Sequence, residues 1–493
     1  MLKSTIQKNF LNYFFAILLV IVASFFSFYS LGKVSLANWD EGIYANIVAE
    51  MDGFPSLLTT YNSEVWLEKP VFGFWLHLVG TNIFGLNNFG LRFVGALCFI
   101  GSVLLFYLIL RKFYSIWISF FTALAFMICP LFYFTHMIRT ADFDAYFLFF
   151  TLLAFWIYIV SWSKPKLFWL VGLVLGVNFM VRGYMAVLAI FVIAFHIILT
   201  KKYRVISFKQ FVYCSLSFLS IVLPWHLYVL IVYPKEFIDS YLGYHFFKRI
   251  IIPLEGHVGN GWFYLNFIFY KINYFIILLF LSFDYFLWKL FKYNKEEDKF
   301  WLLWLLVFFV PLHFMGTKIL WYMMGSIPAM FCLMASTCED LFKSILNKSK
   351  IIITSCVLIV ALAYCYFSLL GAFSYVIYPT ILPVDTVINY MEKNKIEPKE
   401  FLIFSKVDAF NGPAINFWLK KNKNYNVSSF GDALELESYI KNSDDKNIIL
   451  TDLEGYKKIK LLDIENEWIG TTLNYFENDW TENGVPVIFS KKQ

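Results

Sequence analysis

Two adjacent carboxylates, Asp40 and Glu41, stand directly after the first apolar segment of the chain. They lie in the sequence Asn-Trp-Asp-Glu-Gly-Ile-Tyr-Ala, residues 38–45. A carboxylate close to hydrocarbon is costly unless it is paired or used, so the pair indicates acid–base chemistry or cation binding. The structural alternative is that the pair caps a helix beginning at Gly42, because the N-terminal end of a helix favours negative charge.

A second polar stretch, Trp-Leu-Glu-Lys-Pro at residues 66–70, precedes the apolar segment 71–84. Pro70 suits the first turn of a helix. Glu68 and Lys69 would then lie side by side at the lipid boundary. The structural alternative is a local ion pair, which contributes little to stability if it is exposed.

Five cations are expected at the ends of apolar segments, on the same side of the membrane as these carboxylates. They are Lys69, Arg139, Arg182, Arg249 and Lys318. Fixed cations on one face could neutralise a phosphodiester. For any one of them the alternative is a side chain that extends its charge to the interface. Asp144, just inside its apolar segment, should pair with one of these cations or face a cavity, and it is a further candidate catalytic residue.

Two more side chains could complete a site of this kind. Tyr322 could bond a phosphate oxygen, although in a chain with 31 tyrosines a residue of the interfacial belt is an equal alternative. Glu68 together with His257 could hold a divalent metal cation. The alternative for His257 is an ordinary loop histidine.

The elements that must position these residues are membrane-spanning helices. Of the 493 residues, 59% are hydrophobic and 15% are charged, whereas soluble domains have about 25% charged residues. Apolar segments near the following residues are long enough to be read as spans: 10–31, 88–110, 115–135, 144–162, 167–181, 184–200, 211–232, 262–288, 300–316, 319–338 and 351–376. The shorter segment 71–84 indicates a re-entrant or interfacial helix. We therefore expect a polytopic α-helical membrane protein with about 11–13 transmembrane helices.

Basic residues give the expected orientation. They cluster in alternate short loops, which the positive-inside rule assigns to the cytoplasm together with the N-terminus. These clusters are 111–112, 164–166, 201–204, 289–299 and 343–350. The rule places outside the loops 32–87, 136–143, 182–183, 233–261 and 317–318 and the C-terminal tail. The formal charge of +6 lies in such clusters between apolar runs, which fits membrane anchoring and indicates no nucleic-acid partner.

The composition changes beyond Pro379, where apolar runs shorten and charge rises. Segments 401–407, 425–430 and 447–453 are predicted as strands, with helices over 413–421 and 432–441 between them. We therefore expect a transmembrane module over residues 1–378 and a small α/β domain outside the membrane over 379–493. Its position predicts an accessory lid or a domain that recognises a substrate.

Taken in order, these motifs resemble bacterial members of the protein O-mannosyltransferase superfamily, most closely the lipid A aminoarabinose transferase branch. The first two are Asp-Glu-x-x-Tyr-Ala at 40–45 and Glu-Lys-Pro at 68–70. The others lie at 88–92, 136–144, 223–227, 243–245, 256–262, 317–322 and 328–329. The chain departs from the pattern at Val181-Arg182-Gly183, where the family often has Thr-Lys-Gly, and at Trp66, where tyrosine is common.

The resemblance implies a GT-C fold and a glycosyltransferase in the bacterial inner membrane. Such an enzyme moves a sugar from a polyprenyl phosphate to an acceptor outside the cytoplasm: a glycolipid such as lipid A, a glycan or a protein. It supports Asp40 as the general base for direct displacement at the anomeric carbon, with Glu41 orienting the acceptor or the base. It permits a metal at Glu68 and His257 without requiring one.

Two other classes of membrane protein are alternatives to a transferase. A transporter or flippase of lipid-linked sugars should place charged groups near the bilayer midplane and show paired broken helices or repeats. Here the polar residues gather on one face, and the sequence shows no repeat. A receptor-like or structural membrane protein would not need the set of cations around Asp40.

Overall fold

The structure is a computed structural model of the chain. It describes residues 2–51, 53, 55–133, 138–271, 273–345, 351–377, 391, 393, 400–404, 412–422, 425–441, 447–451, 458–459, 468–472 and 487–491. Residues 136–137 of a predicted outside loop, and the parts of the predicted strands beyond 404 and 451, lie outside these ranges. The chain forms two compact units. The helical unit comprises Met1–Tyr29, Val65–Leu76 and Phe93–Ile377, and the mixed unit comprises Ser30–Glu64, His77–Arg92 and Tyr378–Gln493.

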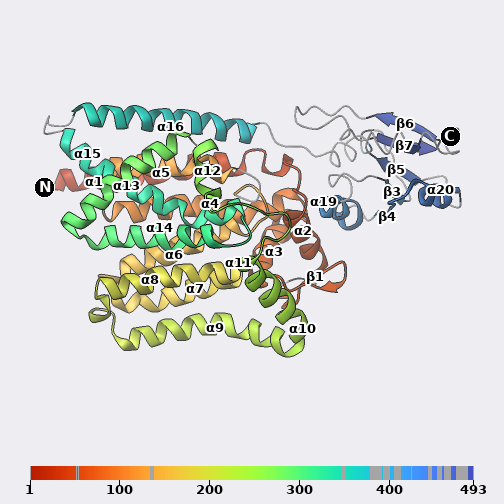
Figure 1. The fold of residues 1–493 in the computed structure, drawn as a ribbon, viewed down its shortest axis with the longest axis horizontal. Helices are drawn as coiled ribbons and strands as arrows, with labels where there is room; N and C mark the ends of the chain where they lie inside the picture. The colour runs from red at the N-terminus through yellow and green to blue at the C-terminus, as the bar shows by residue number, and fades with distance from the viewer. Residues whose placement is uncertain are drawn as a thin grey trace. The chain divides into compact units, whose positions relative to one another are not determined.

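Long apolar helices build the helical unit, and many of them run side by side in Figure 1. They are α1 (Leu2–Phe28), α3 (Phe72–Phe84), α4 (Asn88–Arg111), α5 (Ile116–Met127), α6 (Asp144–Ser161), α7 (Phe168–Arg182), α8 (Val187–Leu199), α9 (Phe208–Val232), α12 (Phe263–Lys271), α13 (Asn273–Tyr293), α14 (Glu296–Phe314), α15 (Ile327–Ile345) and α16 (Ile351–Ile377). The helices α3 and α4 each continue into the mixed unit. Shorter pieces connect them: α10 (Pro234–Glu236), the π-helix η6 (Phe237–Lys248), α11 (Arg249–Ile251) and the 3-10 turns η2 (Pro130–Phe132), η3 (Pro165–Leu167), η4 (Gly183–Ala186), η5 (Lys202–Arg204) and η7 (Leu320–Gly325).

Each of the eleven predicted spans coincides with one or two of these helices. Within the described residues, six stretches are both long and apolar enough to cross a membrane. They are Phe10–Lys33, Asn88–Arg111, Asp144–Ser161, Pro165–Leu199, Phe208–Val232 and Leu320–Lys343. The segment predicted as short forms α3, which is a helix of 13 residues.

Close contact between α7 and α9 depends on glycine. A Cβ atom on Gly172 would lie 1.9 Å from the carbonyl oxygen of Cys214, and one on Gly176 would lie 3.0 Å from that of Phe218. The two glycines are four residues apart and share a face of α7. Small residues at this spacing let helix backbones approach each other, which is the usual way in which membrane helices associate.

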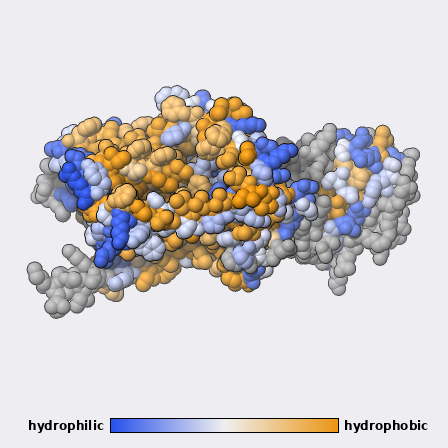
Figure 2. Space-filling model, turned by 90° about the horizontal axis from the view of Figure 1, so that it is seen from below, coloured by the Kyte–Doolittle hydropathy of each residue, from blue (hydrophilic) through white to orange (hydrophobic). Residues whose placement is uncertain are grey.

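The surface of the helical unit is apolar. Figure 2 shows one side of it covered largely by hydrophobic residues. Large side chains such as Ile21, Phe121, Phe195 and Ile231 are exposed. An apolar surface this extensive would not be stable in water, but it fits lipid. The chain is therefore a multi-pass membrane protein, and the direction of its N-terminus stays a prediction.

The mixed unit contains η1 (Leu31–Lys33), α2 (Asp40–Glu50) and the α/β domain predicted at the C-terminus. A small two-stranded sheet, β1 (Thr60–Tyr61) and β2 (Glu64–Val65), precedes α3. The C-terminal sheet has the order β4-β3-β5-β7-β6. Its strands are β3 (Glu400–Phe404), β4 (Asn426–Ser429), β5 (Asn447–Thr451), β6 (Trp468–Thr472) and β7 (Val487–Lys491), and its helices are α19 (Pro413–Asn416), the π-helix η8 (Phe417–Asn422) and α20 (Ala433–Lys441).

In this sheet β3 pairs in parallel with β4 and β5, whereas β7 runs antiparallel to β5 and β6. Leu402, Ile449 and Leu436 of α20 are fully buried in its core. The sequence-based strands and helices of this domain are thus present in the described residues. The contacts also group Ser30–Glu64 and His77–Arg92, which include most of the first predicted outside loop, with this domain, a feature that the predicted boundary at 378/379 did not include.

Candidate active site

Arg92 holds Glu41 in the interior of the mixed unit. Its Nε donates to Glu41 Oε1 at 2.6 Å and its Nη2 to Oε2 at 2.8 Å, and both side chains are almost fully buried. The same guanidinium donates to the carbonyl oxygens of Leu31, Val34 and Ser35. A carboxylate held in this way cannot also collect a proton from a substrate, so the geometry favours an orienting role for Glu41.

Asp40 is the first residue of α2, next to this ion pair. It is partly exposed, whereas Glu41 is fully buried. Trp39 before it has a φ of 67°, which is a strained value for a residue with a side chain. Strain of this kind persists only where the surroundings fix the backbone, so the start of α2 is a well-defined position for a carboxylate.

In the helical unit, Asp144 and Arg182 form a buried ion pair. Asp144 begins α6 and Arg182 ends α7, and the two helices are packed neighbours, so their polar ends meet. The pairing predicted for Asp144 is therefore confirmed, while its catalytic role stays a prediction. The Arg182 guanidinium also lies 5.9 Å from the ring centre of Tyr322, and Tyr322 in turn lies within electrostatic reach of Tyr184.

A second chain of polar contacts links Glu68 to the π-helix η6. Glu68 Oε2 lies 2.9 Å from His245 Nε2, and Arg249 Nε donates to His245 Nδ1 at 3.3 Å. Because Nδ1 accepts a hydrogen bond, we assign the proton of a neutral His245 to Nε2, which then donates to Glu68. Arg249 Nη2 contacts both carboxylate oxygens of Glu255 at 2.7 and 2.8 Å. Burial and the neighbouring Glu255 raise the pKa of Tyr244, which donates to the same carboxylate.

Lys69, Arg139 and Lys318 have different surroundings. Lys69 lies near the ring of Phe143 and within electrostatic reach of Asp144. Arg139 donates to the carbonyl oxygens of Phe26 and Tyr29 at the end of α1. Lys318 Nζ donates to those of Leu312 and His313 at the end of α14, and burial lowers the pKa of Lys318. Both Arg139 and Lys318 cap helix C-termini in the structure. Their contacts with a donor phosphate stay predictions.

The two predicted metal ligands, Glu68 and His257, have other contacts in the structure. Glu68 contacts His245, and the ring of His257 packs edge-on against Trp321. Across the part of the chain that the structure describes, no group of three His, Cys, Asp or Glu residues could hold a metal ion. The metal role of Glu68 and His257 therefore stays a prediction, and we derive no catalytic step from it.

An apolar cavity of about 760 Å³ lies between α7, α8, η6 and α14 of the helical unit. Its walls include Phe179, Leu188, Phe246 and Leu312. Tyr184 also lines the cavity, and it lies within electrostatic reach of Tyr322, Arg182 and Arg249. The apolar cavity thus lies beside a cluster of cations and hydroxyl groups.

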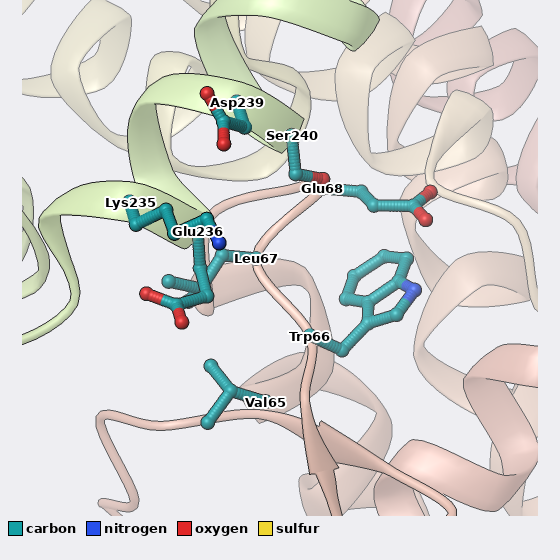
Figure 3. Close-up of a pocket in the computed structure, with 8 residues that line it drawn as sticks. All are labelled: Val65, Trp66, Leu67, Glu68, Lys235, Glu236, Asp239 and Ser240. Carbon is teal, nitrogen blue, oxygen red and sulfur yellow. The ribbon is translucent and has the colours of Figure 1, made fainter.

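A smaller cavity of about 300 Å³ lies beside Glu68. Figure 3 shows the loop that carries Trp66 and Glu68 facing the helical segment that carries Lys235, Glu236 and Asp239. Glu68 directs its carboxylate away from the other two carboxylates in this view. The lining is rich in hydrogen-bond acceptors, which suits hydroxyl or amino groups.

Sequence reasoning missed four residues of these clusters: Arg92, Tyr184, His245 and Glu255. Arg92 and His245 lie in segments that carry the family resemblance, so a signal was present, but nothing in the sequence named their partners. Tyr184 directly follows Arg182 and Gly183, in the segment where the chain departs from the family pattern. Glu255 has a φ of 54°, a strained backbone value that the sequence pattern does not predict.

Comparison with known protein families is consistent with this arrangement. Residues 68–228 match the family described as dolichyl-phosphate-mannose-protein mannosyltransferase. An uncharacterized protein of Aquifex aeolicus is 28% identical over 434 residues, which are 86% of this chain and 81% of that protein. An undecaprenyl phosphate-alpha-4-amino-4-deoxy-L-arabinose arabinosyl transferase of Pseudomonas savastanoi is 29% identical over 292 residues. That alignment covers 56% of this chain and 52% of the relative, so it spans about half the length of the curated transferase.

Solved structures show the same fold. ArnT from Cupriavidus metallidurans bound to undecaprenyl phosphate has a TM-score of 0.68 at 15% identity, covering 97% of this chain and 99% of that one. The archaeal oligosaccharyltransferase AglB from Archaeoglobus fulgidus has a TM-score of 0.52 at 13% identity, covering 89% of this chain and 69% of that one. The resemblance inferred from the motifs is therefore confirmed. The family model and the curated relatives are those of glycosyltransferases, and the solved structures show the fold that the motifs implied.

Proposed function

We propose that this chain, a membrane protein with the fold of GT-C glycosyltransferases, transfers a sugar from undecaprenyl phosphate or a related polyprenyl phosphate to an acceptor outside the cytoplasm. The observation that carries this proposal is an apolar cavity lined by Tyr184, which lies within electrostatic reach of Arg182 and Arg249. The apolar cavity and the neighbouring cations match the two halves of such a donor, a hydrocarbon chain and a phosphate.

The cations of the helical unit can stabilise the phosphate leaving group, which gains negative charge as its bond to the sugar breaks. Each guanidinium has five donors in a fixed plane, and Asp144 and Glu255 fix the orientations of Arg182 and Arg249. Preoriented donors stabilise the leaving group without reorganisation during the reaction. The hydroxyl pair Tyr184 and Tyr322 adds neutral hydrogen-bonding groups beside them.

Asp40 is the general base of the proposed reaction. As the acceptor oxygen or nitrogen attacks the anomeric carbon, its proton passes to the Asp40 carboxylate. The bond between the anomeric carbon and the phosphate oxygen breaks, and the polyprenyl phosphate leaves with the electron pair. The single displacement inverts the configuration at that carbon. Its support is the family resemblance at residues 40–45 and the exposure of Asp40 beside the buried Glu41.

The acceptor belongs to the class of sugars that carry hydroxyl or amino groups. The cavity beside Glu68 has a volume suited to one sugar ring and presents the indole of Trp66 and three carboxylates. Aromatic faces and carboxylates together recognise the apolar faces and polar edges of sugars. Lipid A, other glycolipids and glycans all offer such groups.

The test is turnover of the purified chain in proteoliposomes with an undecaprenyl-phosphate-linked sugar and a lipid extract as acceptor. Release of undecaprenyl phosphate and mass spectrometry of the lipids report transfer, and Asp40→Asn should reduce it to a small residual rate. Full activity of Asp40→Asn would remove the base assignment. Movement of the donor between leaflets without any transfer product would instead indicate a flippase.

A further inference from the structure

Within the mixed unit, the helix that begins at Asp40 is packed against the C-terminal α/β domain. Figure 1 shows α2 beside α19, and the contacts between them are direct. The Nδ2 of Asn46 donates to the carbonyl oxygen of Pro413 at 2.9 Å. The backbone N–H of Ala414 points back to Asn38 Oδ1 at 3.4 Å. The domain therefore bonds to the chain both before and after Asp40.

The packing leaves no space for a side chain at Gly42. A Cβ atom there would lie 2.6 Å from the Ala414 nitrogen and 2.9 Å from the Pro413 carbonyl carbon. These are backbone atoms, which cannot move aside as the end of a flexible side chain can. The conformation of Gly42 itself is helical, so close approach and not backbone freedom is the reason for glycine.

Asn46 makes the contact specific. Its amide is 1% exposed, and it donates both to the carbonyl oxygen of Gly42, one turn earlier, and to that of Pro413. Gly42, Ala45 and Asn46 share one face of α2, because helix positions three and four apart lie together. Ala414, on the facing segment, is equally buried. A buried amide with both donors used fixes the register between the two elements.

We infer that the C-terminal domain positions Asp40 by clamping α2, with Gly42, Asn46 and the Pro413–Ala414 backbone as positioning residues. Two interactions then fix the position of the first turns of α2: the Arg92–Glu41 ion pair and the contact with α19. A small displacement of a reacting group lowers the catalytic rate strongly, so a general base must be held in a fixed position. This inference rests on the proposed role of Asp40 as the base.

The clamp makes a different prediction from a lid or an acceptor-recognition domain. If the domain were a lid or a recognition surface, a substitution that weakens its contacts would change the KM for the acceptor. If the domain positions Asp40, the same substitution lowers kcat and leaves both the donor KM and the acceptor KM unchanged, because Asp40 acts in the transition state.

The test is Gly42→Ala and Asn46→Ala in the full chain, each made in the wild type and in Asp40→Asn. Gly431→Ala is the matched control, since a Cβ at Gly431 meets nothing within 4 Å in the same unit. We expect Gly42→Ala to lower kcat by about 10²-fold and Asn46→Ala by about 10-fold, with both KM values unchanged. In Asp40→Asn, neither change should reduce the residual rate further, because the group that they position is already lost.

Several results would overturn the clamp. One is full kcat in folded Gly42→Ala and Asn46→Ala, and another is the same fold-loss in the Asp40→Asn background as in the wild type. A changed acceptor KM at constant kcat would assign the contact to acceptor recognition. If Gly42→Ala elutes as aggregate, Asn46→Ala decides, since it adds no bulk. A fully active Asp40→Asn is a distinct result: it removes the base assignment, and the clamp with it, but leaves the transferase function standing.

Discussion

Arg92 and Glu41, which are 51 residues apart in sequence, form a two-point ion pair in the interior of the mixed unit. The guanidinium plane matches the carboxylate and also binds the backbone of the 31–35 turn. One residue thus fixes both the loop that leads into α2 and the carboxylate beside Asp40. This geometry explains how two adjacent acidic residues can have different roles: Glu41 is held by Arg92, whereas Asp40 is partly exposed.

Removal of Arg92 should destabilise the mixed unit strongly. Arg92→Ala leaves Glu41 charged and buried, and breaking a buried pair in this way costs about 3–5 kcal/mol in free energy of unfolding. Arg92→Lys should recover only part of the loss, because an ammonium cannot bond both carboxylate oxygens in one plane. Thermal unfolding in detergent measures both, with exposed Lys33→Ala as control. An Arg92→Lys variant as stable as the wild type would show that the two-point geometry is not needed.

Arg182 should matter for donor turnover and depend on Asp144 for its orientation. We expect Arg182→Ala to reduce kcat/KM for the donor by about 10²-fold, the usual loss for one preoriented donor to a developing anion. Asp144→Asn should cause a smaller loss, because a neutral amide holds the guanidinium less firmly. Release of polyprenyl phosphate measures the rates, and Arg204→Ala, exposed on the predicted cytoplasmic side, is the control. Equal rates for Arg182→Ala and the wild type would exclude Arg182 from the phosphate site.

Filling the apolar cavity should discriminate between donors by chain length. Met185 lines the cavity, and Met185→Trp adds bulk to it. We expect a raised KM for a full-length polyprenyl donor and little change for a short-chain analogue, which does not need the space. Leu216→Trp, on an exposed site of α9, is the matched control. An equal effect on both donors would place the lipid chain elsewhere.

The close contact between α7 and α9 at Gly172 should be destabilised by the addition of a single methyl group. Gly172→Ala places a methyl group against the Cys214 carbonyl, so the helices must separate, and overpacking of this kind costs about 1–3 kcal/mol. Gly371→Ala, where a Cβ meets nothing within 4 Å, should be neutral. Thermal unfolding in detergent compares the two. A Gly172→Ala variant with unchanged stability would mean that α7 and α9 are less closely packed than the structure shows.

The amino-acid sequence alone determined the membrane class, the positions of the helices and the polar character of the loops that connect them. The reason is that hydrocarbon imposes length and polarity on each segment separately, so each can be recognised without its neighbours. The pairing of Asp144 with a cation was foreseeable on the same ground, since an acid at the start of a span needs compensation. The strands β3, β4 and β5 of the C-terminal domain and the helices between them were likewise visible in local patterns, whereas β6 and β7 were not predicted.

Only the tertiary structure decided which partner each polar group takes. Glu68 contacts His245, Glu41 contacts Arg92, and Arg139 and Lys318 cap carbonyl groups. Such choices depend on which helices pack together and at what rotation, and these follow from the shapes of many side chains at once. The same holds for Gly42, which reads as an ordinary residue in sequence. Its importance comes from a backbone more than 370 residues later, which lies 2.6 Å from where its side chain would begin.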